Sequence, residues 1–94
     1  MAAHELVDVV ERNKECRLTF HLPPEGARTS LCPGNLVKLI FDDRERMWVR
    51  VREVAGVKYR GVLVSRPAVL RTIEQGDVVD FGPEHVADIY SEGS

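Results

Sequence analysis

The residues best suited to recognition chemistry lie in the stretch 47–64, where arginine and lysine alternate with apolar residues near the chain's single tryptophan. An arginine guanidinium forms paired hydrogen bonds with a carboxylate or a phosphate. An indole ring anchors a protein interface or stacks on a nucleic-acid base. The spacing therefore predicts one binding face, made of Trp48, Arg50, Arg52, Lys58 and Arg60.

A β-hairpin is the element that would position these side chains. Apolar and charged residues alternate on both arms of the stretch 47–64, which is typical of half-buried strands. The turn is expected at residues 55–57. A slip of one residue would mix the two faces, so the pattern itself selects a register. That register pairs Val54 with Lys58, Val49 with Leu63, and Val51 with Gly61.

Two other interpretations of the hairpin face stay open. An N-terminal helix could cover Trp48 and leave the arginines as a solvated surface. Charge is also strongly segregated along the chain: residues 44–71 contain eight Arg or Lys and two acids, whereas residues 72–94 contain six acids and no Arg or Lys. The acidic third could lie beside the basic hairpin and neutralise it.

The rest of the chain predicts short elements separated by glycine and proline turns. In chain order we expect a helix over 3–13, a strand over 16–22, a helical turn over 25–28, a strand over 36–41, the hairpin, a short strand over 68–70 and a strand over 78–81. Proline suits the first position of a helical turn. Residues 82–86 could therefore form such a turn, and residues 86–90 could equally form a closing edge strand. The tail 91–94 is expected to fray.

These elements predict a single domain over residues 1–94 of the mainly β (α+β) class. Its architecture would be a small, strongly bent antiparallel sheet or an SH3-like barrel of five to six strands over residues 16–90, preceded by the helix. A chain of 94 residues supports one modest core.

Four segments of the chain, in this order, resemble the family of small uncharacterised bacterial proteins known as DUF2314. They are LCPGNLVKLIF, ERMWVRV, YRGVLVSRP and GDVVDFGPEHVADI, and the resemblance covers roughly residues 18–89. The run ERMWV is its most specific element. The sequence departs from the family at residues 64–66, where Val-Ser-Arg replaces the usual Asp-Asn before proline. The resemblance implies a fold class and a bacterial origin, but no activity and no functional residue.

Catalytic, metal and cofactor motifs are not expected. His4, His21 and His85 are far apart in the sequence, and no CxxC or HxxH spacing accompanies them. No serine lies in a GxSxG motif, and no glycine run forms a phosphate loop. The sequence therefore predicts a protein without catalytic residues, metal or cofactor.

The first fifteen residues contain four acids and no uninterrupted apolar run, so we expect neither an export signal nor a membrane span. A cytoplasmic location follows, in which Cys16 and Cys32 would stay reduced. The alternative is one disulfide between them in an exported protein.

Composition and motifs together predict a non-enzymatic binding module. The favoured partner is a protein that contacts the Trp48 face, and the alternative is a nucleic acid held by the hairpin cations. An exposed edge strand could also pair two copies into a homodimer.

Overall fold

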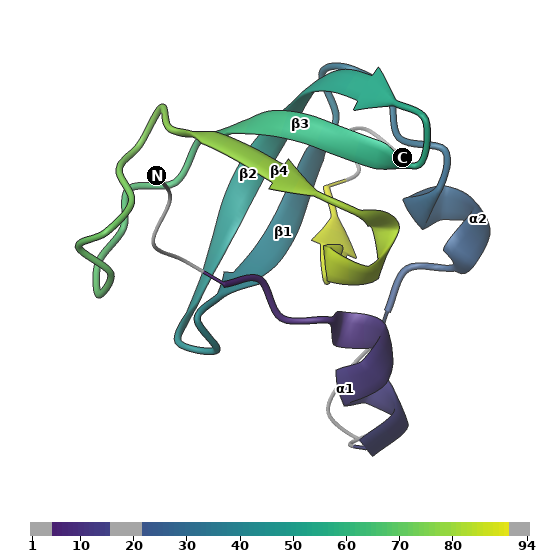
Figure 1. The fold of residues 1–94 in the computed structure, drawn as a ribbon, viewed down its shortest axis with the longest axis horizontal. Helices are drawn as coiled ribbons and strands as arrows, with labels where there is room; N and C mark the ends of the chain where they lie inside the picture. The colour runs from purple at the N-terminus through teal and green to yellow at the C-terminus, as the bar shows by residue number, and fades with distance from the viewer. Residues whose placement is uncertain (1–4, 16–21, 91–94) are drawn as a thin grey trace.

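The computed structural model describes residues 5–15 and 22–90, which form one open five-stranded antiparallel sheet with a few short helices (Figure 1). The strand order is β4-β3-β2-β1-β5. The elements are α1 (Val9–Glu15), α2 (Glu25–Arg28), β1 (Leu36–Phe41), β2 (Glu45–Ala55), β3 (Lys58–Leu63), β4 (Val78–Phe81), the 3₁₀ helix η1 (Pro83–His85) and β5 (Asp88–Ile89).

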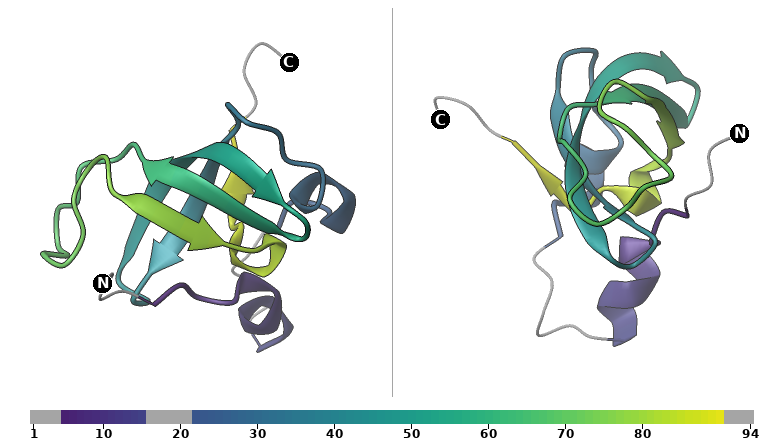
Figure 2. Two further views of the ribbon diagram at one scale, coloured as in Figure 1. Left: turned by 45° about the horizontal axis from the view of Figure 1, so that its top comes forward. Right: turned by 90° about the vertical axis from the view of Figure 1, so that its left-hand side faces the viewer.

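Strands β4 and β5 occupy opposite edges of this sheet, although only residues 82–87 separate them in the chain. Figure 2 shows how the sheet curls so that this short connection can reach across. Both α1 and α2 pack against η1, on the side where the connection lies. Within residues 5–15 and 22–90, none of the helices combines the length and the apolar character that crossing a membrane requires.

The core lies on the concave side of the sheet. Strand positions that alternate along β1 to β4 are almost fully buried there, as the period-two pattern predicts. Tyr59 and Phe81 stack in this core with ring centroids 5.4 Å apart. The buried cluster consists of Leu31, Val37, Leu39, Phe41, Met47, Val49, Val51, Tyr59, Leu63, Ile73, Val79, Phe81 and Val86.

The predicted strands over 36–41 and 78–81 and the helical turn over 25–28 are confirmed at these bounds as β1, β4 and α2. Both elements considered for residues 82–90 are present, as η1 and β5. The strand predicted over 16–22 falls on residues 16–21, which lie outside the described residues, and Leu22 is not in a strand.

The helix predicted over 3–13 differs from the structure in where it begins. Residues 5–8 are not helical, and Leu6 forms a β-bridge with Phe41. The helix starts only at Val9, because the carboxylate of Asp8 accepts the backbone N–H of Glu11 at 3.0 Å and so caps the first turn. The preceding residues pair with β1 instead.

The hairpin prediction is confirmed at Val49–Leu63 and Val51–Gly61, but the pairing of Val54 with Lys58 is wrong. A β-bulge between Val51 and Glu53 shifts the register, so that Ala55 pairs with Lys58. The shift brings Glu53, rather than Arg52, opposite Arg60. Opposite charges across a strand pair are favourable and like charges are not, which explains why the bulged register is preferred.

This register also shortens the turn to Gly56 and Val57. Gly56 has a φ of 64°, and Val57 is not among the residues with positive φ. A positive φ at the first of two loop residues is the requirement of a type II′ hairpin turn, which glycine meets at no steric cost.

The strand predicted over 68–70 is wrong, because a side chain takes up the backbone groups that a strand would use. Both carboxylate oxygens of Glu45 accept backbone N–H groups, from Ala68 at 2.6 Å, Val69 at 2.9 Å and Leu70 at 3.1 Å. These hydrogen bonds, that from Ala68 foremost, lower the pKa of Glu45 below its usual value. Residues 64–77 are therefore an ordered loop, which projects from the sheet at the left of Figure 1.

Candidate binding face of the sheet

The convex side of the sheet carries the candidate site. We call it the outer face, and it is made of the side chains that alternate with the core positions. Its members include Leu36 and Lys38 on β1, Trp48 and Arg50 on β2, Arg60 and Val62 on β3, Val78 and Asp80 on β4, Asp88 on β5, and Tyr90 just after β5.

A partly apolar row crosses the outer face from β4 to β1. Cross-strand partners follow one another in the order Val78, Val62, Arg50 and Leu36. Directly opposed residues of antiparallel strands project from the same side of the sheet. Val62 and Leu36 are half-buried, whereas Val78 is 57% exposed. The outer face therefore presents apolar surface to solvent, with one exposed arginine in its middle.

Trp48 lies beside this row and has a different set of neighbours from the predicted one. It pairs with Lys38, whose ammonium nitrogen lies 4.9 Å from the centre of the indole ring. The ring of Tyr90 meets it edge-on at 6.1 Å and 87°. Both geometries are favourable aromatic contacts. The indole is thus held by a lysine and a tyrosine from β1 and the chain after β5, and it stays half-buried.

The backbone of Trp48 is fixed as firmly as its ring. Its N–H donates to the hydroxyl of Ser65 at 2.8 Å, and its carbonyl accepts the N–H of Val64 at 2.9 Å. The two residues that follow β3 thereby extend the pairing with β2. The chain itself thus fixes the position of the indole, and a side chain fixed in advance would lose less entropy in any contact with another molecule.

Arg60 is the predicted site residue that the acidic third of the chain neutralises. Its guanidinium bonds both carboxylate oxygens of Asp80 on β4, at 2.8 and 3.4 Å. Glu53 is its partner on β2. The hydrogen bond from Arg60 lowers the pKa of Asp80. One of the two open interpretations is thus realised at this position, because the chain supplies its own carboxylate to an arginine of the hairpin.

The other predicted cations are spread along the hairpin. Arg50 is exposed at the centre of the outer face, in the row beside Trp48. Arg52 is exposed at the bulge, and Lys58 is exposed at the start of β3, opposite Ala55. The structure therefore brings Trp48 and Arg50 together and places Arg52 and Lys58 toward the hairpin turn.

Sequence reasoning missed Leu36, Lys38 and Tyr90 as members of this site. Lys38 interrupts the otherwise apolar run LVKLIF, and a lone cation at an alternate strand position indicates an exposed side. That signal was available. The contact between Tyr90 and Trp48 was not, because it depends on β5 pairing with β1 across residues distant in sequence.

Of the histidine and cysteine candidates, the structure describes His85 and Cys32. His4, His21 and Cys16 lie outside the described residues, and Cys32 is an exposed free thiol. Within residues 5–15 and 22–90, no three His, Cys, Asp or Glu side chains are placed to hold a metal ion. The Nδ1 atom of His85 accepts the N–H of Gly82 at 3.0 Å, so this imidazole caps η1.

The burial of this imidazole makes stability depend on pH. Burial, opposed by the charges of Glu84 and Asp8 and aided by Lys58, lowers the pKa of His85 below its usual 6.5. The unfolded chain then binds the proton more readily, so this contribution is complete above pH 6.5 and is lost as the pH falls from 6.5 toward the lower folded pKa. When the free energy of unfolding is measured by urea denaturation at a series of pH values, His85→Asn should lack the decrease in stability that the native chain shows as the pH falls below 6.5. Equal slopes in both proteins would contradict this assignment.

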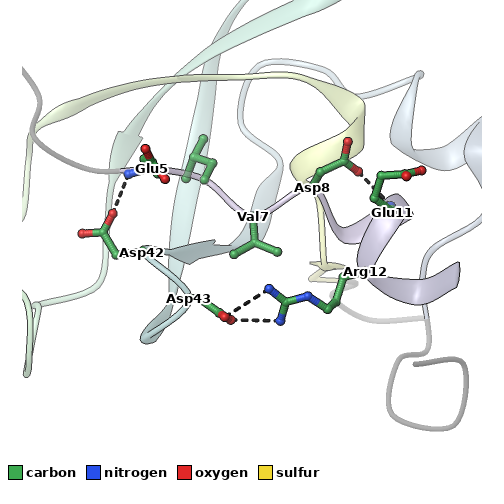
Figure 3. A pocket seen from close by; sticks show the side chains of 8 residues that line it. Glu5, Val7, Asp8, Glu11, Arg12, Asp42 and Asp43 are labelled. Atoms are coloured by element: carbon green, nitrogen blue, oxygen red, sulfur yellow. Dashed lines mark hydrogen bonds and ion pairs between the residues drawn. The ribbon is translucent and has the colours of Figure 1, made fainter. Parts of the chain in front are cut away.

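An acidic groove of about 440 Å³ lies where the N-terminal segment meets the β1–β2 turn (Figure 3). The backbone N–H of Glu5 donates to the carboxylate of Asp42 at 2.6 Å, and Arg12 bonds both oxygens of Asp43 at 3.0 and 3.1 Å. The hydrogen bond from Arg12 lowers the pKa of Asp43. These contacts attach the N-terminal segment to the β1–β2 turn. The acidic side chains of the groove therefore have a structural role.

Comparison with models of known protein families, with curated proteins and with solved structures found no match for this chain. The resemblance to DUF2314 therefore stays a prediction that rests on the four segments of the sequence.

Proposed function

We propose that this protein is a non-enzymatic binding module whose outer face contacts a protein partner, with Trp48 as the anchor. The observation that carries the proposal is the composition of that face: a fixed, half-buried indole lies among exposed or half-exposed Leu36, Val62 and Tyr90. Aromatic anchors surrounded by apolar and cationic neighbours dominate the energetics of protein interfaces.

The charges of the outer face favour a protein over a nucleic acid. Asp80 and Glu53 flank Arg60, and Asp88 pairs with Lys38 across the β1–β5 ladder. A phosphate backbone would approach these carboxylates at a cost, because like charges repel. A protein surface with an apolar centre could pack against Trp48. A few carboxylates at its rim could pair with Arg50 and Lys38.

We further propose that the curled sheet is a small barrel of the SH3-like type, and the order of its elements supports this. A meander of four strands leads through a single 3₁₀ turn into a short fifth strand, and that strand pairs back onto β1. This order of elements is what such small barrels require to cover one core with one curled sheet.

Binding to a nucleic acid is the second candidate, favoured by the exposed cations Arg50, Arg52 and Lys58 along β2 and β3. It differs from the first candidate in its response to salt. Phosphate contacts release counterions, so nucleic-acid binding weakens steeply as salt rises, whereas an apolar interface is much less affected.

Affinity purification of the tagged protein from its host, washed in a salt series, tests both candidates. We expect a stoichiometric protein that stays bound at about 1 M salt, where the Debye length is only about 3 Å. Trp48→Ala should weaken its binding by about 2 kcal/mol or more, which is roughly thirtyfold in Kd. Arg50→Glu combined with Arg52→Glu should have the larger effect if the ligand is a nucleic acid.

Val57→Ala is the matched control, because Val57 is 78% exposed at the hairpin turn and lies away from Trp48. Tyr90→Ala removes the edge contact with the indole while leaving the strands intact, and it should weaken binding less than Trp48→Ala does. Folding of each variant is checked by circular dichroism. Unchanged binding by folded Trp48→Ala and Tyr90→Ala proteins would overturn the proposal.

A further inference from the structure

Residues 64–77, between β3 and β4, form a loop without helix or strand. Its ends are held together, since the N–H of Leu63 donates to Asp77 at 2.9 Å and the N–H of Gly76 donates back to Leu63 at 2.8 Å. Structureless loops of this length are uncommon in compact domains. Compact loops with joined ends are frequently functional.

Side-chain hydrogen bonds also fix the middle and the end of the loop. The Glu45 carboxylate holds its middle through three consecutive N–H groups, and the side-chain amide of Gln75 donates to the carbonyl of Val64 at 2.8 Å. Ile73 is only 3% exposed and belongs to the core. The loop walls are therefore set in place before a ligand binds, which is what an affinity for a small molecule requires.

A groove of about 440 Å³ opens in this loop, and two arginines line it. Leu70, Ile73 and Pro67 give it apolar walls, and Glu74 and Gln75 complete the lining. Both Arg66 and Arg71 are exposed. In the part of the chain that the structure describes, neither guanidinium has an ion-pair or hydrogen-bond partner.

The carboxylate of Glu45 does not neutralise these arginines, because it is hydrogen-bonded to the backbone of the loop. Glu45 lies against the same loop, but its oxygens accept the N–H groups of Ala68, Val69 and Leu70. Among the described residues that line the groove, Glu74 alone carries a negative charge, whereas Arg66 and Arg71 carry positive ones. The groove thus keeps a net positive charge beside an apolar wall.

We infer that this groove binds a small molecule carrying an oxyanion, a phosphate or a carboxylate, through Arg66 and Arg71. The planar guanidinium matches either group with two parallel hydrogen bonds. An apolar portion of the ligand would rest on Leu70 and Pro67. The site is separate from the outer face and does not depend on the proposed partner.

Backbone amide NMR spectra recorded during titration with inorganic phosphate, and separately with succinate, test the inference at constant ionic strength held by sodium chloride. We expect shifts confined to residues 65–75 with at least one of the two anions. The probe that saturates at the lower concentration identifies whether phosphate or carboxylate is preferred. Arg66→Gln combined with Arg71→Gln should weaken that binding by roughly tenfold or more, because each lost pair of charged hydrogen bonds is worth about that much.

Lys14→Gln combined with Arg44→Gln is the matched control, since it removes the same charge from exposed positions outside the groove and outside the outer face. It should leave the affinity nearly unchanged. Arg71→Lys keeps the charge but loses the planar fork, and it should give an intermediate affinity. The inference is overturned if neither anion shifts the loop, if shifts spread over all basic segments, or if the control loses as much affinity as the groove variant.

Discussion

Replacing Gly61 by valine is expected to destabilise the protein by about 3 kcal/mol, the upper end of what overpacking a core costs. Gly61 is buried opposite Val51, in the middle of the sheet. A Cβ atom at this position would lie 2.6 Å from the carbonyl oxygen of Arg50 and 2.6 Å from a methyl group of Val49. A backbone atom cannot move aside as a flexible side chain can, so β2 and β3 would have to separate.

Thermal unfolding measures this effect, because 1 kcal/mol corresponds to roughly 4–8 °C in Tm for a domain of this size. Gly26→Val is the matched control, since a Cβ atom at Gly26 would meet nothing within 4 Å. It should shift the Tm by only a few degrees. A Gly61→Val protein that melts with the native chain would show that the register of the hairpin is wrong.

Replacing Phe81 by alanine is expected to cost about 4 kcal/mol, within the range for removing a buried phenyl ring. Phe81 is 1% exposed and stacks on Tyr59 across the β3–β4 pair. Its loss would leave a cavity at the place where the edge strand β4 turns into η1. Urea denaturation followed by circular dichroism gives the free energy of unfolding directly.

Val78→Ala provides the comparison within the same strand. Val78 is 57% exposed and projects from the outer face, so its truncation should change stability by less than about 0.5 kcal/mol. The two variants together test which side of β4 faces the core. Equal losses of stability from both would rule out the assignment of the outer face.

Much of the sheet could be predicted from local pattern alone. The run 36–41 and the alternation over 47–51 and 59–63 specify β1 and most of the hairpin, because burial on one side penalises every other register. Gly76 followed by Asp77 marked the start of β4 correctly. These signals act over a few residues, and so they are visible in the sequence.

The features that the sequence did not disclose depend on contacts between distant residues. The bulge after Val51 follows from the pairing of Glu53 with Arg60, and the extended backbone at Leu6 follows from its bridge to Phe41. A helix pattern over 3–13 was also present, but pairing with β1 overrode it over residues 5–8. Periodicity records which residues are apolar and leaves open which partner covers them.

The candidate site could be predicted in its centre and less well at its margins. Trp48 and Arg50 lie side by side on one face, as alternation requires. The alternation also assigned Arg60 to this face. In the structure its guanidinium is paired with a carboxylate on β4. Segregated charge along the chain indicated this pairing in general terms, without identifying Asp80 as the partner.

The shortness of both outer strands bears on how this protein behaves when it is concentrated. β4 spans four residues and β5 spans two, and β4 carries the charged Asp80. The far edge of β1 is already occupied by β5 and by residues 6–7. Long, uncharged edges are templates on which sheets of separate molecules add to one another and grow into fibrils, whereas short charged edges resist such growth. Within residues 5–15 and 22–90, the fold thus leaves little edge backbone through which copies could polymerise.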